Sequence, residues 1–319
     1  WMSCGMLQAA PVGSDEPLRL DAKTPRVELN AYFEYFADPG SVGGVYGIHA
    51  LPAKAFTRHS SDVPNFGFTD QRYWFRTRLL QVSGDENWFL QFDYTPLDNI
   101  DVYLLDQYGE MLVAEHGGDR WSFAGRLIKS RQFTVELPLP LDEPVWLYVA
   151  VQTEGSLQMP AVLFNGPNYV AKTRVEYYLL GLFYGVLLSM LLYTLLTYFS
   201  VRDVSYLYYI AYIAACSLFQ LTINGLSYEF FWPQMPELNN RMLPLSITVA
   251  TLTLILLTRS FLQTRTLMPR IDRLLSLMRW LYLILALACL FIPYNWAIRL
   301  STASVVISPL VVLAIALWV

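Results

Sequence analysis

The sequence predicts a two-part protein: an all-β jelly-roll sandwich followed by an α-helical bundle that crosses a membrane several times. Two patterns lead to this fold class. Apolar residues recur at every second position in the first half of the 319-residue chain, and five long apolar runs occupy the second half. The hydrophobic fraction of 55% is too high for an ordinary soluble protein. We place the sandwich at 18–165, a linker at 166–176 and the bundle at 177–319.

The first residues, 1–17, look like the end of a secretory signal peptide. Small residues, Ala9 and Ala10, stand where a peptidase could cut, and a polar stretch containing Pro11 follows them. This leader predicts that the sandwich lies outside the cytoplasm.

Strand periodicity is clear in several segments of the sandwich. In "NWFLQFDY" the apolar set Trp88, Leu90 and Phe92 alternates with Phe89 and Gln91. Segments such as "TPLDN", "DQYGE" and "EHGGD" separate the strands and supply the glycine, Asp and Asn residues that chain reversals use. Short strands with such turns, and almost no helical pattern, indicate an antiparallel sandwich or jelly roll.

Charge and motif content exclude several classes of function. Residues 1–176 hold 14 basic and 22 acidic side chains, a balance of −8, so this half lacks the clustered Lys and Arg that nucleic-acid binding requires. It also lacks a Gly-x-Ser-x-Gly elbow and a His-Glu-x-x-His helix, so we predict no catalytic activity in this segment. No Cys or His pair has the spacing of zinc ligands.

A binding role is the more plausible one for the sandwich. Aromatic rings stack on the apolar faces of sugars, and guanidinium groups form paired hydrogen bonds with hydroxyls or carboxylates. The side chains that we predict to bind a small-molecule or carbohydrate ligand are Trp88, Tyr94, Trp121, Arg126 and Arg131. A purely structural role is the alternative, above all for tryptophans inside strands, such as Trp88.

A calcium site is a weaker hypothesis. Asp93, Asp98 and Asp101 follow one another near strand ends, where oxygen-rich turns suit Ca²⁺. The alternative is that they are ordinary solvated turn residues. We predict no other cofactor.

The predicted spans are long enough to cross a bilayer, which takes roughly 20 apolar residues per helix. They are 177–200, 204–224, 242–262, 274–293 and 297–319. None of them contains Asp, Glu, Lys or His, which disfavours a transporter or a proton pathway. Only three residues separate the first two runs, so we expect a tight antiparallel hairpin.

The distribution of arginines predicts the orientation. With residues 18–165 outside, the inner connections contain Arg202, Arg259, Arg265, Arg270 and Arg273, whereas the outer side contains Arg241 and Arg299. This agrees with the positive-inside rule and with the leader.

Two glycines in the first span, Gly181 and Gly185, have the small-xxx-small spacing that lets helix backbones approach closely. They could serve packing within one bundle, which we favour, or pairing with a second copy or another receptor.

Several segments, taken together, resemble one known family. In the helical half they are "YYLLGLFYGVLLSMLLYTLLTYFSVRDVSYLYYIAYI", "NGLSYEFFWP" and "RSFLQTRTLMPRIDRLL"; in the sandwich they are "RYWFRTRL", "NWFLQFDYTPLDNIDVYLL" and "GRLIKSRQFTVEL". The chain from about Leu29 to Arg273 resembles the bacterial seven-transmembrane receptors with diverse intracellular signalling modules, 7TMR-DISM, and their extracellular sensor domain.

The resemblance implies a jelly-roll sensor related in shape to carbohydrate-binding modules, and a transducer of seven helices, five of them in this chain. It also implies a cytoplasmic output module such as a histidine kinase or a diguanylate cyclase, which connects the family to two-component and cyclic di-GMP signalling. We therefore expect a receptor in a bacterial inner membrane with its sensor in the periplasm. The alternative is a membrane-anchored carbohydrate-binding or assembly module without a signalling output.

Overall fold

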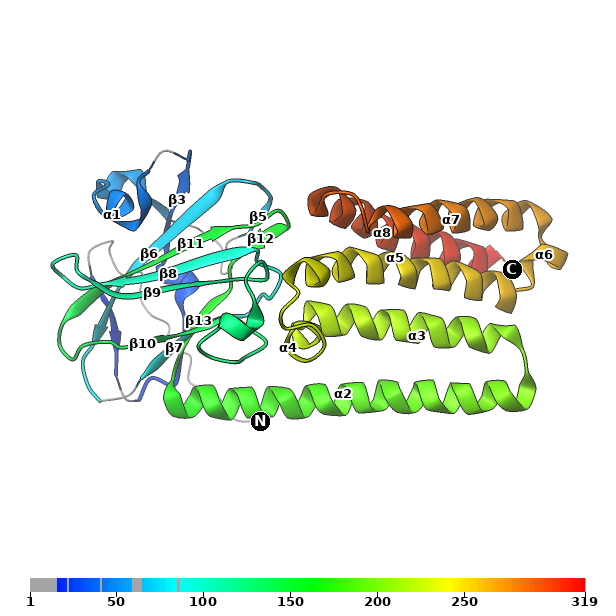
Figure 1. The fold of residues 1–319 in the computed structure, drawn as a ribbon, viewed down its shortest axis with the longest axis horizontal. Helices are drawn as coiled ribbons and strands as arrows, with labels where there is room; N and C mark the ends of the chain where they lie inside the picture. Colours follow the sequence, from blue (N-terminus) through cyan, green and yellow to red (C-terminus); the bar gives the residue numbers. More distant parts are fainter. Residues whose placement is uncertain (1–15, 22, 41, 59–64, 85–86, 319) are drawn as a thin grey trace. The chain divides into compact units, whose positions relative to one another are not determined.

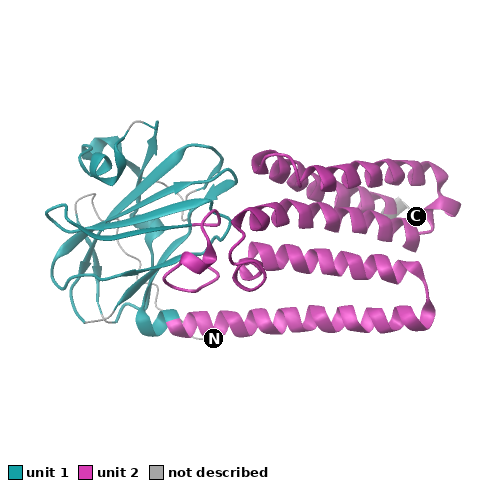
Figure 2. Ribbon diagram, viewed as in Figure 1, with its two compact units in different colours: residues 1–117, 133–169 teal, residues 118–132, 170–319 magenta. Residues whose placement is uncertain are grey.

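The computed structural model describes residues 16–318 apart from residues 22, 41, 59–64 and 85–86. The leader predicted at 1–17 lies almost wholly outside the described residues. The chain divides into two compact units (Figure 2): unit 1 contains residues 1–117 and 133–169, and unit 2 contains residues 118–132 and 170–319.

Unit 1 is the predicted β-sandwich (Figure 1). In its described part, one sheet has seven strands in the order β4–β3–β6–β11–β8–β9, with β1 paired to β6, and a second has four strands in the order β10–β7–β13–β2. The first sheet contains β1 (Leu18–Leu20), β3 (Glu34–Asp38), β4 (Thr57–Arg58), β6 (Arg72–Gln81), β8 (Asn99–Leu105), β9 (Met111–Gly117) and β11 (Pro144–Gln152). The second contains β2 (Arg26–Glu28), β7 (Trp88–Phe92), β10 (Thr134–Leu137) and β13 (Ala161–Asn165). Strands β5 (Asn65–Phe68) and β12 (Ser156–Gln158) form a small third sheet.

Alternation decides which side chains fill the space between the two large sheets. From β6, Phe75 and Leu79 are fully buried in the central core, and β7 contributes Trp88, Leu90 and Phe92 to the same cluster. Because side chains on a strand point to opposite faces in turn, the period of two in the sequence correctly placed Trp88, Leu90 and Phe92 on one face. The neighbouring residues of β6 point to the other face, which the short helix α1 (Gly44–His49) helps to cover.

The predicted linker at 166–176 is helical in the structure. Helix α2 (Gly166–Val201) begins directly after β13, and the boundary between the units falls inside it, after Tyr169. The side chain of Asn165 accepts a hydrogen bond from the backbone N–H of Asn168 at 3.2 Å, and Pro167 stands in the first turn. Both features are typical of a helix start. The sequence therefore places a stiff element where a linker was predicted.

Unit 2 contains the long helices. They are α2, α3 (Val204–Ile223), α5 (Pro236–Phe261), α7 (Pro269–Ala288) and α8 (Tyr294–Trp318), with the short helices α4 (Leu226–Phe230) and α6 (Thr264–Leu267) between them. Helix α5 packs against α3, α7 and α8 (Figure 1). The tight turn predicted after the first span is present, because only Arg202 and Asp203 separate α2 from α3.

Four helices in the described part of the chain, α2, α3, α5 and α8, are long and apolar enough to cross a membrane. The fourth predicted span, 274–293, largely coincides with α7, which begins at Pro269 and ends at Ala288. The charged residues Arg270, Asp272 and Arg273 precede the predicted span, and Arg279 lies within it. The fourth span therefore stays a prediction.

Gly181 and Gly185 of α2 have no packing partner among the described residues. A Cβ atom built on Gly181 or on Gly185 meets no heavy atom within 4 Å among the described residues. Only 6% of the apolar window of α2 is buried, compared with 56% of the window of α5. The favoured interpretation, packing of these glycines inside one bundle, is therefore not what the structure shows, and pairing with a second copy stays a prediction.

Alanine at either glycine is expected to leave the folding of a single chain intact. The open space accepts a methyl group, and an exposed helix interior gains up to about 1 kcal/mol when Ala replaces Gly. The measurement is the melting temperature of Gly181→Ala and Gly185→Ala in detergent, at a dilution where the chain is monomeric. A lower melting temperature for either variant would contradict the open face.

Candidate coupling site around Arg131

The residues 118–132 connect two strands of the sandwich, β9 and β10, yet they belong to the compact helical unit. Figure 2 shows this connection in the colour of unit 2. It contains a short 3₁₀ turn, Phe123–Gly125, and three of the five predicted ligand-binding residues, Trp121, Arg126 and Arg131. We call residues 118–132 the coupling segment.

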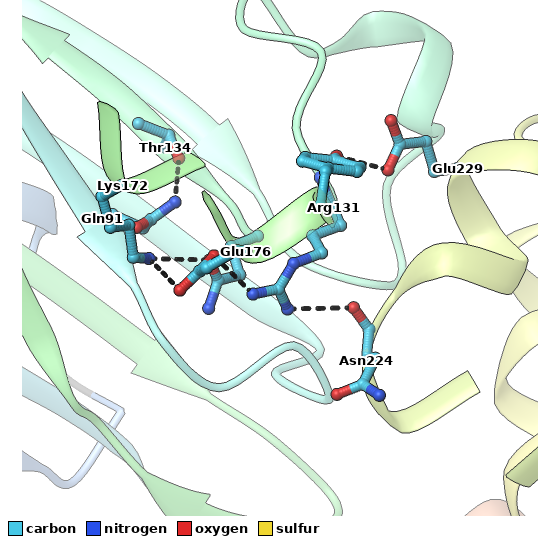
Figure 3. A network of polar contacts seen from close by, with 9 residues as sticks. Gln91, Arg131, Thr134, Lys172, Glu176, Asn224 and Glu229 are labelled. Carbon is cyan, nitrogen blue, oxygen red and sulfur yellow. Dashed lines mark hydrogen bonds and ion pairs between the residues drawn. The ribbon is translucent and has the colours of Figure 1, made fainter. Parts of the chain in front are cut away.

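Arg131 is the centre of a polar network on this segment (Figure 3). Its Nη2 lies 2.7 Å from Oε2 of Glu176 on α2, and its Nη1 donates to the backbone oxygen of Asn224, just after α3, at 3.2 Å. Lys172, one turn earlier on α2, lies 2.9 Å from the other Glu176 oxygen and also donates to Gln132 at 3.2 Å. The Arg131 side chain is only 10% exposed, so this ion pair is largely shielded from water. One guanidinium thus connects the coupling segment to two helices.

A second arm of the network leads to α4. The backbone N–H of Arg131 donates to the Tyr177 hydroxyl at 3.4 Å, and this hydroxyl donates to Oε2 of Glu229 at 2.7 Å. Burial raises the pKa of the Glu229 carboxyl above its usual range, although the hydrogen bond from Tyr177 and the charge of Arg131 oppose the shift. The coupling segment, α2 and α4 therefore share one connected set of hydrogen bonds.

Aromatic packing fixes the other end of the coupling segment. The Phe123 ring meets the ring of Tyr228 on α4 edge to face, with centroids 5.9 Å apart, and the Phe123 N–H donates to the oxygen of Pro233 at 3.0 Å. The Tyr228 hydroxyl donates to the backbone oxygen of Trp121. The Arg126 guanidinium lies 5.0 Å from the Phe123 ring centre, within cation–π range.

The five predicted ligand-binding residues lie in different environments. Arg126 and Arg131 direct guanidinium donors to groups of their own unit, including the Ser130 oxygen, 3.0 Å from Nη1 of Arg126. Trp121 is 48% exposed, as its position in a turn predicted. Trp88 is 1% exposed in the sandwich core and offers no face to a ligand, and Tyr94 packs partly buried against that core.

The sequence analysis did not identify Glu176 and Glu229 as site residues, because no local sequence pattern marks an interaction partner so far along the chain.

The three aspartates of the calcium hypothesis have separate partners. Asp98 is buried and accepts a hydrogen bond from the Thr153 hydroxyl at 2.9 Å. Asp101 binds Arg72 with one oxygen and His116 Nδ1, at 2.7 Å, with the other, whereas Asp93 is exposed. Within the described residues no three His, Cys, Asp or Glu side chains gather as a metal site would require. The structure does not bring these aspartates together.

A second polar clamp lies at the opposite ends of the helices. Arg259, near the end of α5, binds Asp272 of α7 through Nε at 2.9 Å and Nη2 at 3.0 Å, and the Thr264 hydroxyl of α6 donates to the same carboxylate at 2.9 Å. The paired bond from Arg259 lowers the pKa of Asp272. This clamp holds the connection between α5 and α7 in one conformation.

Together, an all-β domain and a set of membrane-length helices, connected by the coupling segment, define a membrane protein with a folded domain outside its spans. A family model described as "7TM diverse intracellular signalling" matches residues 176–319, and "7TMR-DISM extracellular 2" matches residues 30–165. The chain belongs to the 7TMR-DISM family of transmembrane receptors, and its sandwich is the extracellular sensor domain of that family.

Other comparisons add little. No curated protein matches the chain. Among solved structures, the enzymatically active domain of tailspike protein 4 from bacteriophage CBA120 is similar over 44% of this chain and 19% of the phage chain, at 8% identity and a TM-score of 0.23. A TM-score this low carries no argument about fold or activity.

Glutamine at position 229 is expected to flatten the pH dependence of stability. Because the folded-state pKa of Glu229 is raised, the native state holds the proton more tightly, and stability falls as pH rises from the usual glutamate pKa through the raised value. Glutamine cannot ionise, and its carbonyl oxygen still accepts the Tyr177 hydrogen bond.

The measurement is the melting temperature of the detergent-solubilised chain and of Glu229→Gln from pH 4 to pH 8. The difference between the two proteins isolates Glu229 from Asp272, whose lowered pKa gives the opposite slope. A difference that stays constant over this range would contradict the assignment.

Proposed function

We propose that this chain is the sensor and transducer part of an inner-membrane receptor. The sandwich faces the periplasm and binds a small carbohydrate-like ligand or Ca²⁺. The coupling segment and α2 pass the binding event to the helices, which control a cytoplasmic output module such as a histidine kinase or a diguanylate cyclase. The observation that carries the proposal is the ion pair between Arg131 and Glu176.

That ion pair supports signal transmission because of where its residues stand in the chain. Arg131 is held between two strands of the sandwich in sequence, and Glu176 is on the helix that continues from the last strand of the sandwich. The chain therefore passes between the sandwich and the helical unit at both ends of the coupling segment and again within α2. A ligand can shift the receptor between two states only by as much as its binding free energy differs between those states. We expect a stiff connection through both the coupling segment and α2 to transmit more of this difference to the helices than one flexible linker would.

The orientation rests on charge. Arginines gather at the end of the bundle that also holds the Arg259–Asp272 clamp, with Arg202, Arg265 and Arg270. Short loops rich in Lys and Arg stay on the cytoplasmic side of a membrane. The aromatic side chains Phe230 and Phe231 of the opposite end are exposed, as rings at a membrane interface are.

Hydrogen–deuterium exchange on the full chain in nanodiscs tests the proposal. The probes are a panel of sugars and polyols together with CaCl₂. A receptor predicts that a panel member which slows exchange in the sandwich also changes exchange in residues 118–132 and in the first turns of α2. Slower exchange confined to the sandwich would favour the alternative, an anchored binding module. No response to any panel member would remove these ligands from the proposal.

A further inference from the structure

A hollow opens at one end of the seven-stranded sheet, where β3 ends and β6 begins. Its volume is about 450 Å³, within the range of small-molecule pockets, roughly 300–1,000 Å³. Its walls combine the polar side chains of Asp38, Asp70, Gln71, Arg72 and Gln152 with Gly40 and the apolar residues Pro39 and Val42. None of these was predicted from the sequence as a ligand-binding residue. All belong to unit 1, so the hollow is a feature of the sensor domain alone.

The carboxylate of Asp38 is held in place before any ligand arrives. It is 8% exposed, and it accepts hydrogen bonds from Trp74 Nε1 at 3.2 Å and from the Gly40 N–H at 2.8 Å. A carboxylate has about four acceptor positions, so two such bonds leave acceptor capacity for a ligand. On the other wall, Gln152 Nε2 donates to the backbone oxygen of Asp70 at 3.1 Å and steadies that loop.

The balance of charge in the hollow is negative. The one basic wall residue, Arg72, is paired with Asp101, and its guanidinium lies 4.9 Å from the centre of the Trp74 ring. Among the described residues, the carboxylates of Asp38 and Asp70 form no ion pair. An anionic ligand would therefore meet two carboxylates and a guanidinium that is already neutralised.

The aromatic content of the hollow argues against a neutral sugar. Neutral sugars are commonly held by an open aromatic face, but the Trp74 ring is 1% exposed and lies beneath Arg72. The walls are best suited to a ligand that donates hydrogen bonds. The two carboxylates accept hydrogen bonds from a cationic group. The side-chain amides of Gln71 and Gln152 can both donate hydrogen bonds to hydroxyls and accept hydrogen bonds from them.

We infer that this hollow binds a small hydroxylated amine, with the ammonium group against Asp38 and Asp70 and the hydroxyls against the glutamine amides. This inference rests on the proposed function, because it names the class of ligand that the sensor domain takes. The contact is ionic, so binding weakens as salt is added.

The test is isothermal titration of the full chain in detergent with D-glucosamine, and with D-glucose and D-gluconate as compounds of similar size that are neutral and anionic. We expect D-glucosamine to bind at least tenfold more tightly than D-glucose, D-gluconate not to bind, and the D-glucosamine affinity to fall between 50 and 300 mM NaCl. Equal affinities for the amine and the neutral sugar, or tighter binding of D-gluconate, would overturn the inference.

Two variants locate the site. Asp70→Asn changes an exposed carboxylate and leaves the fold intact, and it is expected to weaken D-glucosamine binding about tenfold; Asp38→Asn is expected to weaken it further if its melting temperature stays near that of the parent. Glu143→Gln, an exposed carboxylate of unit 1 outside the hollow, is the matched control. Unchanged affinity in Asp70→Asn would overturn the inference.

The outcomes for this inference and for the proposed function can be told apart. If D-glucosamine does not bind, while another ligand of the exchange panel changes hydrogen–deuterium exchange in residues 118–132, this inference is wrong and the proposed function stands.

Discussion

Methionine in place of Arg131 is expected to destabilise the helical unit by about 2 kcal/mol. Removing one partner of a fully buried ion pair costs roughly 3–5 kcal/mol, and the 30% exposure of the Glu176 side chain lowers that figure. The variant also removes the donor to the Asn224 oxygen. The measurement is unfolding in mixed detergent micelles, followed by helical circular dichroism. Exchange of residues 118–132 is expected to rise in parallel.

Lys172→Met is the matched control, because Lys172 binds the same carboxylate of Glu176 from one helical turn away at 2.9 Å. Such pairs within one helix contribute about 0.2–0.5 kcal/mol. The double variant Arg131→Met with Glu176→Gln is expected to lose less than the sum of its single changes, since Glu176 no longer carries an unpaired charge. If Arg131→Met and Lys172→Met lose the same amount of stability, Arg131 is not the centre of the coupling site.

Periodicity predicted most of the fold, because the physical cause is local. Side chains on a strand point to the core at every second position, so Leu90 and Phe92 could be assigned to the core from the sequence alone. The same pattern places Trp88 with Leu90 and Phe92, so it favoured the structural role of Trp88 over the predicted role in ligand binding. The boundary between the two compact units, after Tyr169, falls inside the predicted linker at 166–176. The helical conformation of that linker was not predicted, although the Asn165 cap and Pro167 favour a helix start.

The candidate site was only half predictable. Arg126 and Arg131 were chosen because a guanidinium can form paired hydrogen bonds with hydroxyls or carboxylates, but that chemistry alone does not say whether a ligand or the protein itself receives those bonds. The partners of Arg131, Glu176 and Asn224, lie 45 and 93 residues away. Such pairings are set by the packing of distant elements, and a single sequence carries no signal for them. The hydrogen bond of Asp98 could not be predicted for the same reason, because its partner Thr153 is 55 residues away.

The base of the coupling segment is closed by a contact between Gly117, the residue before it, and Phe133, the residue after it. A Cβ atom on Gly117 would lie 2.1 Å from Cε2 of Phe133, far closer than any real carbon contact. The Phe133 ring is 6% exposed and stacks on Phe92 with centroids 6.0 Å apart, so it cannot swing into solvent without opening the core. The hydrogen atom of Gly117 is therefore what permits the two ends of the segment to meet.

Gly117→Ala is accordingly expected to destabilise the sandwich by about 1–3 kcal/mol, the usual cost of overpacking a core. The backbone of Gly117 lies outside the left-handed region, so the penalty is steric alone. Phe133→Leu makes room for the new methyl group, and the double variant is expected to lose less than the two single changes together. The control is Gly125→Ala inside the coupling segment, where an added Cβ meets nothing within 4 Å among the described residues. If the two alanine variants melt alike, or if Phe133→Leu brings no relief, Gly117 and Phe133 do not hold the base of the segment closed.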